Sequence, residues 1–376
     1  MTIGIVTTHY ALNYGAVLQA FALQNYISSL GYNCEIIDYR PNRTAYGRSY
    51  YPKVSNGKDF ILASYKFMKI SAKKTYKRKV KAFDDFISNN INLSSKIFYT
   101  YEELLQSMNK YDVFICGSDQ IWNLDICYDR AYFLDFKSKY PNSKYIAYAP
   151  SIASDLNDKY KLDILKKHLA YFDNISLREY SSKILIEKLL NKSATAVLDP
   201  VFIYGKENWV DLINDGDVYK KPYIFCYFIG VSDTSRQSVK ILKQITGYDV
   251  VYVNVMARNS IDSTLCLKDI SPKDFVSLIK NSAIVCTNSF HATAFSLIFE
   301  KEMFTILNNN KRNSRMKDLL KSLDLDDRLI SDSDNLTEKI GSIYKNKISY
   351  EKVNQKLNIL INESQTYLND SLSFKK

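Results

Sequence analysis

The sequence lacks the features that mark a secreted or a membrane-spanning protein. No apolar run approaches the roughly 18 residues that a transmembrane helix needs, and Met1-Thr2 provides no basic start for a secretory leader. The six cysteines are scattered, mostly within apolar strand-like runs, which favours reduced core thiols over a disulfide framework or a zinc site. We therefore expect a cytoplasmic protein.

Motifs for common cofactors are also missing. The chain has no G-x-G-x-x-G fingerprint, no G-x-x-x-x-G-K-[ST] loop and no metal-ligand spacing, so neither a bound cofactor nor a metal is expected. The formal net charge of +11 comes without a helix-turn-helix or an RNA-binding signature, and aromatic residues do not interleave with a compact basic patch. The charge therefore favours a phosphorylated substrate or an anionic membrane over nucleic acid.

Length and patterning predict two α/β domains. A chain of 376 residues is long for one core, and its content of 46% hydrophobic and 14% aromatic residues is typical of a globular protein. Short apolar runs alternate with helical patterns, which predicts mainly parallel sheets covered by helices. The expected strands are 3–6, 34–37, 113–116, 145–148 and 196–198 in the first set, and 223–229, 250–255, 283–287 and 303–307 in the second.

The polar stretch 206–221 separates the two sets of strands. We therefore expect an N-terminal Rossmann-like domain over residues 1–200, a C-terminal one over 201–345, and a helical segment over 346–376. Two Rossmann-like domains that face a cleft form the GT-B architecture of many sugar-processing enzymes.

A basic amphipathic pattern interrupts the first domain between residues 61 and 87. Apolar residues recur there every three or four positions, and Lys or Arg fills many of the others. One interpretation is a helix packed on the sheet with a solvated basic face. The other is a surface that rests on anionic lipid.

Polar and flexible residues follow the first strand. The stretch HYALNYG contains His9, Asn13, Tyr14 and Gly15, and a helix is expected from about Ala16. Ligands bind beyond the carboxyl ends of parallel strands, and free N–H groups at a helix start can hold an anion, so these four residues are candidate ligand contacts. The alternative is a strand–helix turn that needs Asn or Gly for its backbone angles.

A second strand runs directly into GSDQIWN. Ser118, Asp119 and Gln120 offer hydroxyl, carboxylate and amide groups suited to sugar hydroxyls, and Trp122 offers an apolar face for a sugar ring. Alternatively, Ser118 or Asp119 caps a helix and Trp122 belongs to the core.

Candidate cations and one histidine follow later strands. Arg178 is suited to the bidentate recognition of a carboxylate or phosphate, or it forms a salt bridge to a neighbour such as Glu179. The run NNNKRNSR carries Lys311, Arg312 and Arg315, which form either an anion clamp or a solvated loop.

His291 is one of only three histidines and opens an expected helix at the edge of the cleft. A helix N-terminus disfavours an imidazolium, so His291 would act as an acid only beside a bound anion. The alternative is that His291 is a residue at a helix start with no role in catalysis.

These motifs occur in an order that resembles the polysaccharide pyruvyl transferase family. The likeness covers most of residues 1–330 and rests on NYGAVLQAFALQ, GSDQIWN, SLRE, LDPV, NSFHATAFSL and the SR-x-x-DLL run at 314–320. The resemblance implies a GT-B fold and transfer of the enolpyruvyl group of phosphoenolpyruvate to a sugar, which closes into a cyclic ketal in surface polysaccharide synthesis. It also implies that phosphoenolpyruvate is a substrate and that no cofactor is required.

The resemblance also suggests roles for residues. It implies that His291 is the general acid and that Arg178, with Lys311 as a weaker candidate, contacts the anionic groups of phosphoenolpyruvate. Many relatives have Arg where this chain has Ser289, and Lys311 or Arg312 is expected to replace that cation.

The sugar acceptor is expected on the N-terminal side, with Asp119 as the group that takes its proton. A lipid-linked acceptor would place the enzyme at the inner face of the membrane through the 61–87 helix. The nearest alternative is a GT-B glycosyltransferase that uses a nucleotide sugar, and a carbohydrate-binding protein without activity is a more distant one.

Overall fold

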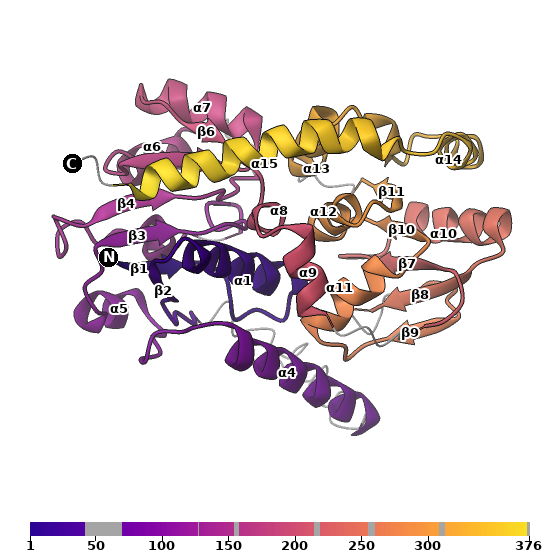
Figure 1. The fold of residues 1–376 in the computed structure, drawn as a ribbon, viewed down its shortest axis with the longest axis horizontal. Helices are drawn as coiled ribbons and strands as arrows, with labels where there is room; N and C mark the ends of the chain where they lie inside the picture. The colour runs from indigo at the N-terminus through magenta and orange to yellow at the C-terminus, as the bar shows by residue number, and fades with distance from the viewer. Residues whose placement is uncertain are drawn as a thin grey trace.

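The protein folds into two lobes, each built on a six-stranded parallel sheet (Figure 1). The computed structural model describes residues 1–41, 70–126, 128–153, 158–213, 219–254, 260–307 and 313–373. The strand order is β2-β1-β3-β4-β5-β6 in the N-terminal sheet and β12-β11-β10-β7-β8-β9 in the C-terminal sheet. Every pairing between these strands is parallel, which confirms the expected α/β class.

The strands are short and mostly buried. The N-terminal sheet contains β1 (Thr2–Val6), β2 (Asn33–Ile36), β3 (Val113–Cys116), β4 (Lys144–Ala147), β5 (Asn174–Leu177) and β6 (Thr195–Ala196). The C-terminal sheet contains β7 (Tyr223–Tyr227), β8 (Asp249–Val253), β9 (Leu265–Leu267), β10 (Ile284–Thr287), β11 (Glu302–Ile306) and β12 (Leu329–Ile330). Continuous apolar runs such as VFIC in β3 are typical of strands covered on both faces.

Helices connect the strands. In the N-terminal half they are α1 (Tyr14–Ser29), α4 (Ile70–Asn90), α5 (Tyr101–Ser107), α6 (Lys159–Leu169), α7 (Tyr180–Leu190), α8 (Pro200–Ile203) and α9 (Lys206–Leu212). The C-terminal half contains α10 (Asp233–Thr246), α11 (Pro272–Lys280), α12 (Phe290–Ile298), α13 (Ser314–Ser322), α14 (Leu336–Lys345) and α15 (Tyr350–Leu372). Short 3-10 turns lie at Arg130–Phe133 and Asp326–Arg328. Within the described ranges, no helix is both long enough and apolar enough to span a bilayer.

Three strands were not expected from the sequence: β5, β9 and β12. Strands β9 and β12 have three and two residues, too few for a pattern to emerge. Strand β5 is a four-residue run, NISL, that ends directly before Arg178 and begins with a polar residue. The polar stretch 206–221, expected as a separator, begins with helix α9, whose Trp209 is fully buried.

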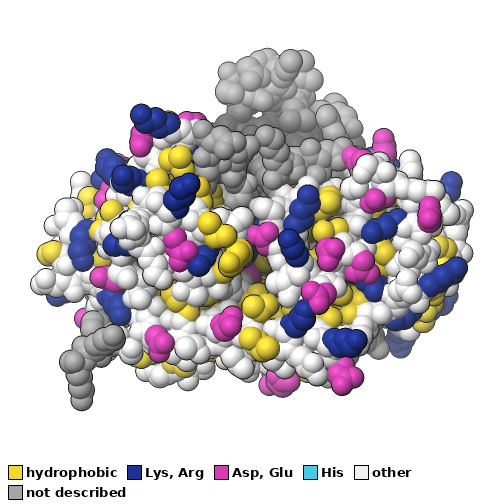
Figure 2. Space-filling view, turned by 90° about the horizontal axis from the view of Figure 1, so that it is seen from above, with side chains coloured by type: hydrophobic (Ala, Val, Ile, Leu, Met, Phe, Trp, Pro, Cys, Tyr) yellow, Lys and Arg dark blue, Asp and Glu magenta, His cyan; other side chains and the backbone are white. Residues whose placement is uncertain are grey.

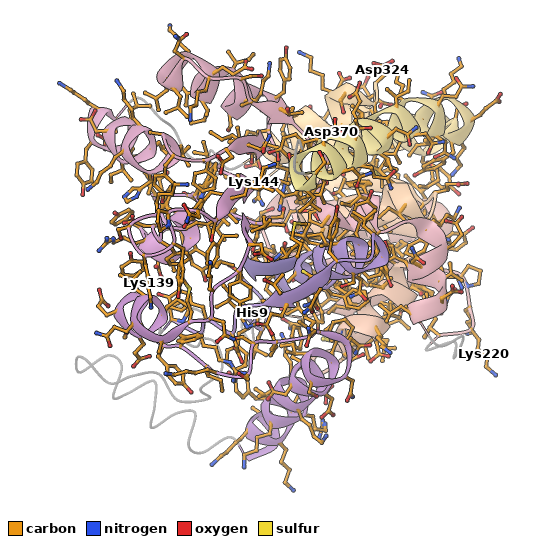
Figure 3. All side chains as sticks on the ribbon, turned by 60° about the vertical axis from the view of Figure 1, so that its left-hand side comes forward. His9, Lys139, Lys144, Lys220, Asp324 and Asp370 are labelled. Carbon is orange, nitrogen blue, oxygen red and sulfur yellow. The ribbon has the colours of Figure 1, made fainter. Side chains whose placement is uncertain are left out.

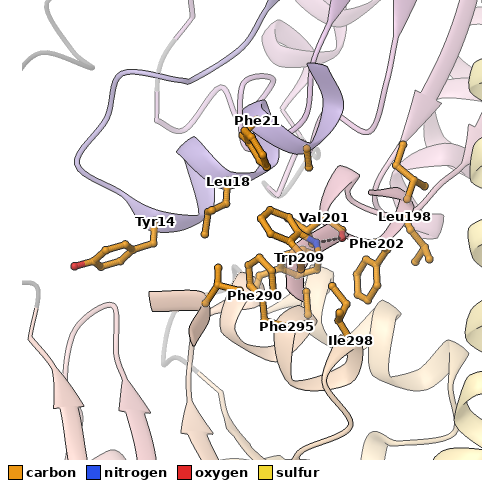
Figure 4. Close-up of a cluster of buried hydrophobic side chains, with 14 of the residues drawn as sticks. Tyr14, Leu18, Phe21, Leu198, Val201, Phe202, Trp209, Phe290, Phe295 and Ile298 are labelled. Atoms are coloured by element: carbon orange, nitrogen blue, oxygen red, sulfur yellow. Dashed lines mark hydrogen bonds between the residues drawn. The ribbon is translucent and has the colours of Figure 1, made fainter. Parts of the chain in front are cut away.

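Both lobes contribute to one apolar core at their interface. Helix α1 packs against α11 and α12 of the C-terminal lobe, and the Tyr14 ring stacks on Phe275 with centroids 4.5 Å apart. Trp209 lies between Phe21 of α1 and Phe295 of α12 (Figure 4). This close packing holds the carboxyl ends of the two sheets in a fixed relation.

The last helix returns to the N-terminal lobe. Figure 1 shows α15, in yellow, crossing both lobes towards the C-terminus. The hydroxyl of Ser364 accepts a hydrogen bond from the Leu198 N–H at 2.9 Å, and the Tyr367 hydroxyl donates to the Ala147 carbonyl at 2.9 Å. The helix expected after residue 346 thus ties the two lobes together.

Only part of the basic stretch 61–87 belongs to the described residues. Helix α4 begins at Ile70, and residues 61–69 lie outside the described ranges. Arg78 pairs with Asp269 of the C-terminal lobe. Lys79 is buried, with its ammonium 5.5 Å from the centroid of the Tyr14 ring. This side of α4 therefore packs on protein, as the first interpretation proposed, and the membrane interpretation stays a prediction.

The substitution Lys79→Met should stabilise the protein at neutral pH. Burial lowers the pKa of Lys79 from 10.5 to about 8, and Met keeps the length of the chain without a charge. We expect a gain of roughly 1–3 kcal/mol in the free energy of unfolding at pH 7. Between pH 8 and 10.5 the unfolded wild type binds more protons than the folded one. Wild-type stability should therefore rise with pH in this window, relative to the variant.

Chemical denaturation at pH 7 and pH 10 measures both effects. Lys77→Met on the exposed side of α4 is the matched control and should change stability little. A variant at position 79 that is less stable than wild type at pH 7 would contradict the reasoning.

Candidate active site

His291 lies at the junction of the two lobes. It follows β10 in the first turn of α12 and is 7% exposed. Its Nε2 lies 3.5 Å from Oδ2 of Asp199. This nitrogen has no hydrogen-bond partner among the described residues. The imidazole is thus placed by the protein and still able to bond to a ligand.

Asp199 is the buried centre of the site. Its Oδ1 accepts the N–H of Val201 at 3.1 Å and so caps α8. Its Oδ2 accepts from the Ser118 hydroxyl at 3.1 Å and pairs with Arg178 Nη2 at 2.6 Å. Burial would raise the pKa of Asp199, but Arg178 and His291 outweigh it and lower the pKa below its usual value. Asp199 therefore stays ionised and holds groups from both lobes.

Gly15 makes room for the imidazole. A Cβ at this position would lie 1.9 Å from Nδ1 of His291, so only glycine allows α1 to approach the ring. The ring therefore lies beside the first turns of α1 and α12, with Nδ1 towards Gly15 and Nε2 towards Asp199.

Arg178 has hydrogen-bonding capacity to spare. Its Nη2 pairs with Asp199 and donates to the Ser118 hydroxyl, so the salt-bridge partner is Asp199 rather than Glu179. Its Nε and Nη1 are buried without a partner among the described residues. The guanidinium carbon lies 4.7 Å from the centroid of the Phe290 ring. The unpaired N–H donors on these two nitrogens can bind the oxygens of an anion.

Sequence reasoning missed two functional candidates at this site, Asp199 and Glu179, and named Arg315 only as one cation of the run NNNKRNSR. Asp199 lies in the LDPV run and Glu179 in SLRE, so the motifs named for the resemblance were the available signal. Glu179 is fully buried and accepts a hydrogen bond from Ser151. Burial raises the pKa of Glu179, against the effects of the Ser151 hydrogen bond and of Arg315 and Arg178.

A pocket of about 320 Å³ opens at the ends of β1 and β3. Asn13, Asp119 and Gln120 line it, and their role as acceptor contacts stays a prediction. Asn13 also caps α1, because its Oδ1 accepts the Ala16 N–H at 3.3 Å. Asp119 has φ of 79°, a conformation that costs a non-glycine residue energy and is often kept at functional positions.

Other predicted contacts are structural instead. Trp122 is fully buried, stacks on Phe133 and donates through Nε1 to the Tyr132 carbonyl at 3.0 Å. It therefore offers no face to a sugar, and its assignment as an acceptor contact was wrong. Tyr14 belongs to the core between the lobes, and its hydroxyl donates to the Ile270 carbonyl at 3.3 Å.

His9 is also a core residue rather than an acceptor contact. It is fully buried, and Figure 3 shows it enclosed within the N-terminal lobe. Its Nε2 lies 3.0 Å from Oδ1 of Asp38, which Arg40 also binds. Figure 2 shows no histidine among the described side chains on the face that it presents. This agrees with the burial of all three histidines.

Two further predicted residues have structural duties. Ser118 holds Arg178 and Asp199 and is fully buried, so it positions the site rather than contacting an acceptor. Ser289 caps α12, with its hydroxyl accepting the Ala292 N–H at 3.5 Å. Lys311 and Arg312 lie outside the described residues.

Gly15→Ala should displace His291. The added methyl would overlap the imidazole, and overpacking of this kind costs about 1–3 kcal/mol. We expect a lower melting temperature and a shift of the His291 ring signals in the NMR spectrum, which is simple to assign with three histidines. Gly341→Ala in α14, where a Cβ meets open space, is the control. Unchanged His291 signals in Gly15→Ala would refute this seating of the ring.

Comparison with solved structures shows the GT-B fold. UDP-GlcNAc 2-epimerase from Neisseria meningitidis, bound to UDP-GlcNAc, is 10% identical with a TM-score of 0.55, and the match covers 99% of each chain. Arabidopsis thaliana UGT89C1 complexed with UDP-L-rhamnose is 8% identical with a TM-score of 0.54, covering 98% of this chain and 97% of that one. At such low identities the likeness concerns the fold alone.

The sequence comparisons identify the family. No curated protein matches the chain. The family model described as polysaccharide pyruvyl transferase matches residues 13–310, a span that holds Asn13, Asp119, Arg178, Asp199 and His291. The chain therefore belongs to the polysaccharide pyruvyl transferase family.

Proposed function

We propose that this protein transfers the enolpyruvyl group of phosphoenolpyruvate to a sugar and closes it into a cyclic pyruvate ketal in surface polysaccharide synthesis. The observation that carries the proposal is the buried group of His291, Arg178 and Asp199 at the ends of the strands, where both lobes meet. Family membership supports the class of reaction, and the residues support its individual steps.

Arg178 would bind the phosphoenolpyruvate. This donor carries a carboxylate and a phosphate, and the unpartnered Nε and Nη1 of Arg178 can donate hydrogen bonds to their oxygens. Asp199 and Ser118 hold the guanidinium through Nη2, which keeps Nε and Nη1 directed for the ligand. The Phe290 ring beside it excludes water and so strengthens the charge interaction.

His291 would act as the general acid. Its Nε2 proton passes to the methylene carbon of phosphoenolpyruvate, and positive charge develops at the neighbouring carbon. A sugar hydroxyl attacks this carbon and gives up its proton. Phosphate then leaves with the electron pair of its C–O bond and takes up one proton, and a second sugar hydroxyl closes the ketal and releases the proton that restores His291. Gly15 and Asp199 hold the two ring nitrogens of His291 in position for this transfer.

The sugar would bind in the pocket lined by Asn13, Asp119 and Gln120. Amide and carboxylate groups fit the hydroxyls of a sugar, and Asp119 would accept the proton of the attacking hydroxyl. The strained backbone at Asp119 supports a functional role, because the strain fixes the direction of its carboxylate.

A lipid-linked sugar and contact with an anionic membrane remain part of the proposal. They rest on the basic stretch 61–87, of which α4 is the described portion. Lys74 and Lys77 are exposed there, whereas Arg78 pairs with Asp269 of the C-terminal lobe and Lys79 is buried against the Tyr14 ring. The exposed side of α4 is the surface that such contact would use.

Phosphate release from phosphoenolpyruvate, measured with and without a glycan acceptor, tests the function. We expect release only with the acceptor, and a pyruvate ketal in the product. His291→Asn should lower kcat about 10²–10⁴-fold, as expected for loss of a general acid. His168→Asn, which changes an imidazole on α6 away from the site, should retain activity.

The nearest rival predicts a different ligand. A GT-B glycosyltransferase would bind a nucleotide sugar and would not consume phosphoenolpyruvate. Calorimetry with each compound separates the two, and heat only from the nucleotide sugar would overturn the proposal. Full turnover in His291→Asn would exclude His291 as the acid.

Substitutions at Asp119 should separate stability from activity. Asp119→Gly relieves the cost of a positive φ, and we expect it to stabilise the fold by up to about 1 kcal/mol while kcat falls. Asp119→Asn keeps the shape but not the base, and should lose kcat without weaker binding of phosphoenolpyruvate. Thermal unfolding, turnover and calorimetry measure the three effects. Wild-type kcat in both variants would remove Asp119 from the mechanism.

A further inference from the structure

Two guanidinium groups from different lobes lie beside one phenyl ring. Arg178 follows β5 of the N-terminal lobe, and Arg315 lies in the first turn of α13 in the C-terminal lobe. Their guanidinium carbons are 4.7 and 5.8 Å from the centroid of the Phe290 ring. Asp199 pairs with Arg178 at 2.6 Å, so the second guanidinium adds a positive charge that this carboxylate does not already balance.

The described residues leave Arg315 without a counter-ion. Arg315 forms no hydrogen bond or ion pair with them, and its Nε is buried without a partner. Burial and the charge of Arg178 lower the pKa of Arg315, against the more distant attraction of Glu179, Asp119 and Asp199. Arg315 is partly exposed, but its buried Nε–H is a donor that a purely structural arginine would normally pair.

The two arginines border a small pocket. This pocket of about 160 Å³ is lined by Arg178 and Arg315, by the carboxylates of Asp199 and Asp318, and by apolar side chains such as Phe290 and Leu319. It is smaller than the roughly 300–1,000 Å³ of pockets that hold drug-sized ligands. Its size suits a small ligand rather than a nucleotide sugar, and Asp199 is already paired with Arg178, which leaves Arg315 as the cation open to an anion.

We propose that Arg315 is a second cation for the phosphorylated substrate, and that Arg178 and Arg315 hold one small dianion from both lobes. The inference rests on the proposed function for the identity of the ligand, a three-carbon phosphate with a carboxylate. One guanidinium binds the carboxylate and the other binds the phosphate, so the ligand neutralises the repulsion between them. Ser289 has no charge to offer and is engaged in capping α12. Arg315 provides the further positive charge.

A ligand-binding role and a structural role predict opposite effects on stability. Without ligand, Arg315→Ala removes a repelled, unpartnered cation, so its melting temperature should equal or exceed that of wild type. Phosphoenolpyruvate should raise the melting temperature of wild type and have much less effect on the variant. A structural arginine would instead lower the melting temperature when it is removed.

Calorimetry with phosphoenolpyruvate and with inorganic phosphate tests the site directly. We expect Arg315→Ala to bind phosphoenolpyruvate about 10–100-fold more weakly, as for the loss of a charge-assisted contact. Arg315→Lys, which keeps the charge but not the planar fork, should be intermediate. Lys317→Ala removes a charge from the exposed side of the same helix and should bind within about twofold of wild type. In turnover, the KM for phosphoenolpyruvate should rise more than kcat falls.

Each outcome bears on the inference. Wild-type affinity in Arg315→Ala overturns it, even if the enzyme consumes phosphoenolpyruvate as proposed. If ligand-free Arg315→Ala melts well below wild type, Arg315→Lys decides the matter. A Lys variant that restores the melting temperature but not the affinity for phosphoenolpyruvate supports the inference. A Lys variant that restores both shows that any positive charge suffices, and this overturns the proposed binding of one dianion by two guanidinium groups. If wild type binds phosphate through Arg315 but does not bind phosphoenolpyruvate, the anion site stands and the proposed function fails.

Discussion

The ionised carboxylate of Asp199 is the interaction on which the site depends. It lies in the interior and joins Arg178 and Ser118 of the N-terminal lobe to His291 of the C-terminal lobe. A buried arginine without such a partner would be costly, and so would a buried carboxylate without its cation. The ion pair therefore offsets the desolvation cost of both charges. It also sets the direction in which the remaining N–H groups of Arg178 point.

The apolar interface between the lobes makes this arrangement possible. Trp209, Phe21 and Phe295 pack the lobes together, and Gly15 lets α1 approach close enough to touch the His291 ring. A site assembled from two lobes would lose its geometry if they moved freely, since small displacements reduce catalysis strongly. Helix α15 adds a second connection by returning to the N-terminal sheet.

The fold and the family contribute different information. Similar folds occur in an epimerase and in UGT89C1, both solved with UDP-sugars, so the two-lobed architecture does not select one reaction. The charges in the site are more specific. The guanidinium groups of Arg178 and Arg315 lie beside Phe290, and Arg178 shares the carboxylate of Asp199 with His291. This arrangement fits the small anionic substrate proposed for this member of the pyruvyl transferase family.

The sequence by itself determined the α/β class, the order of most strands and the segments that carry the site. Buried parallel strands are continuous apolar runs, and ligand contacts follow their carboxyl ends, so GSDQ, SLRE and NSFH could be found without coordinates. Only the tertiary structure decided which residue in each segment faces the site. Trp122 and His9 turn into the core, while Asp199 and Arg315 turn towards Arg178 and Phe290. The reason is that burial and pairing of charges depend on neighbours distant in sequence, which local patterns do not contain.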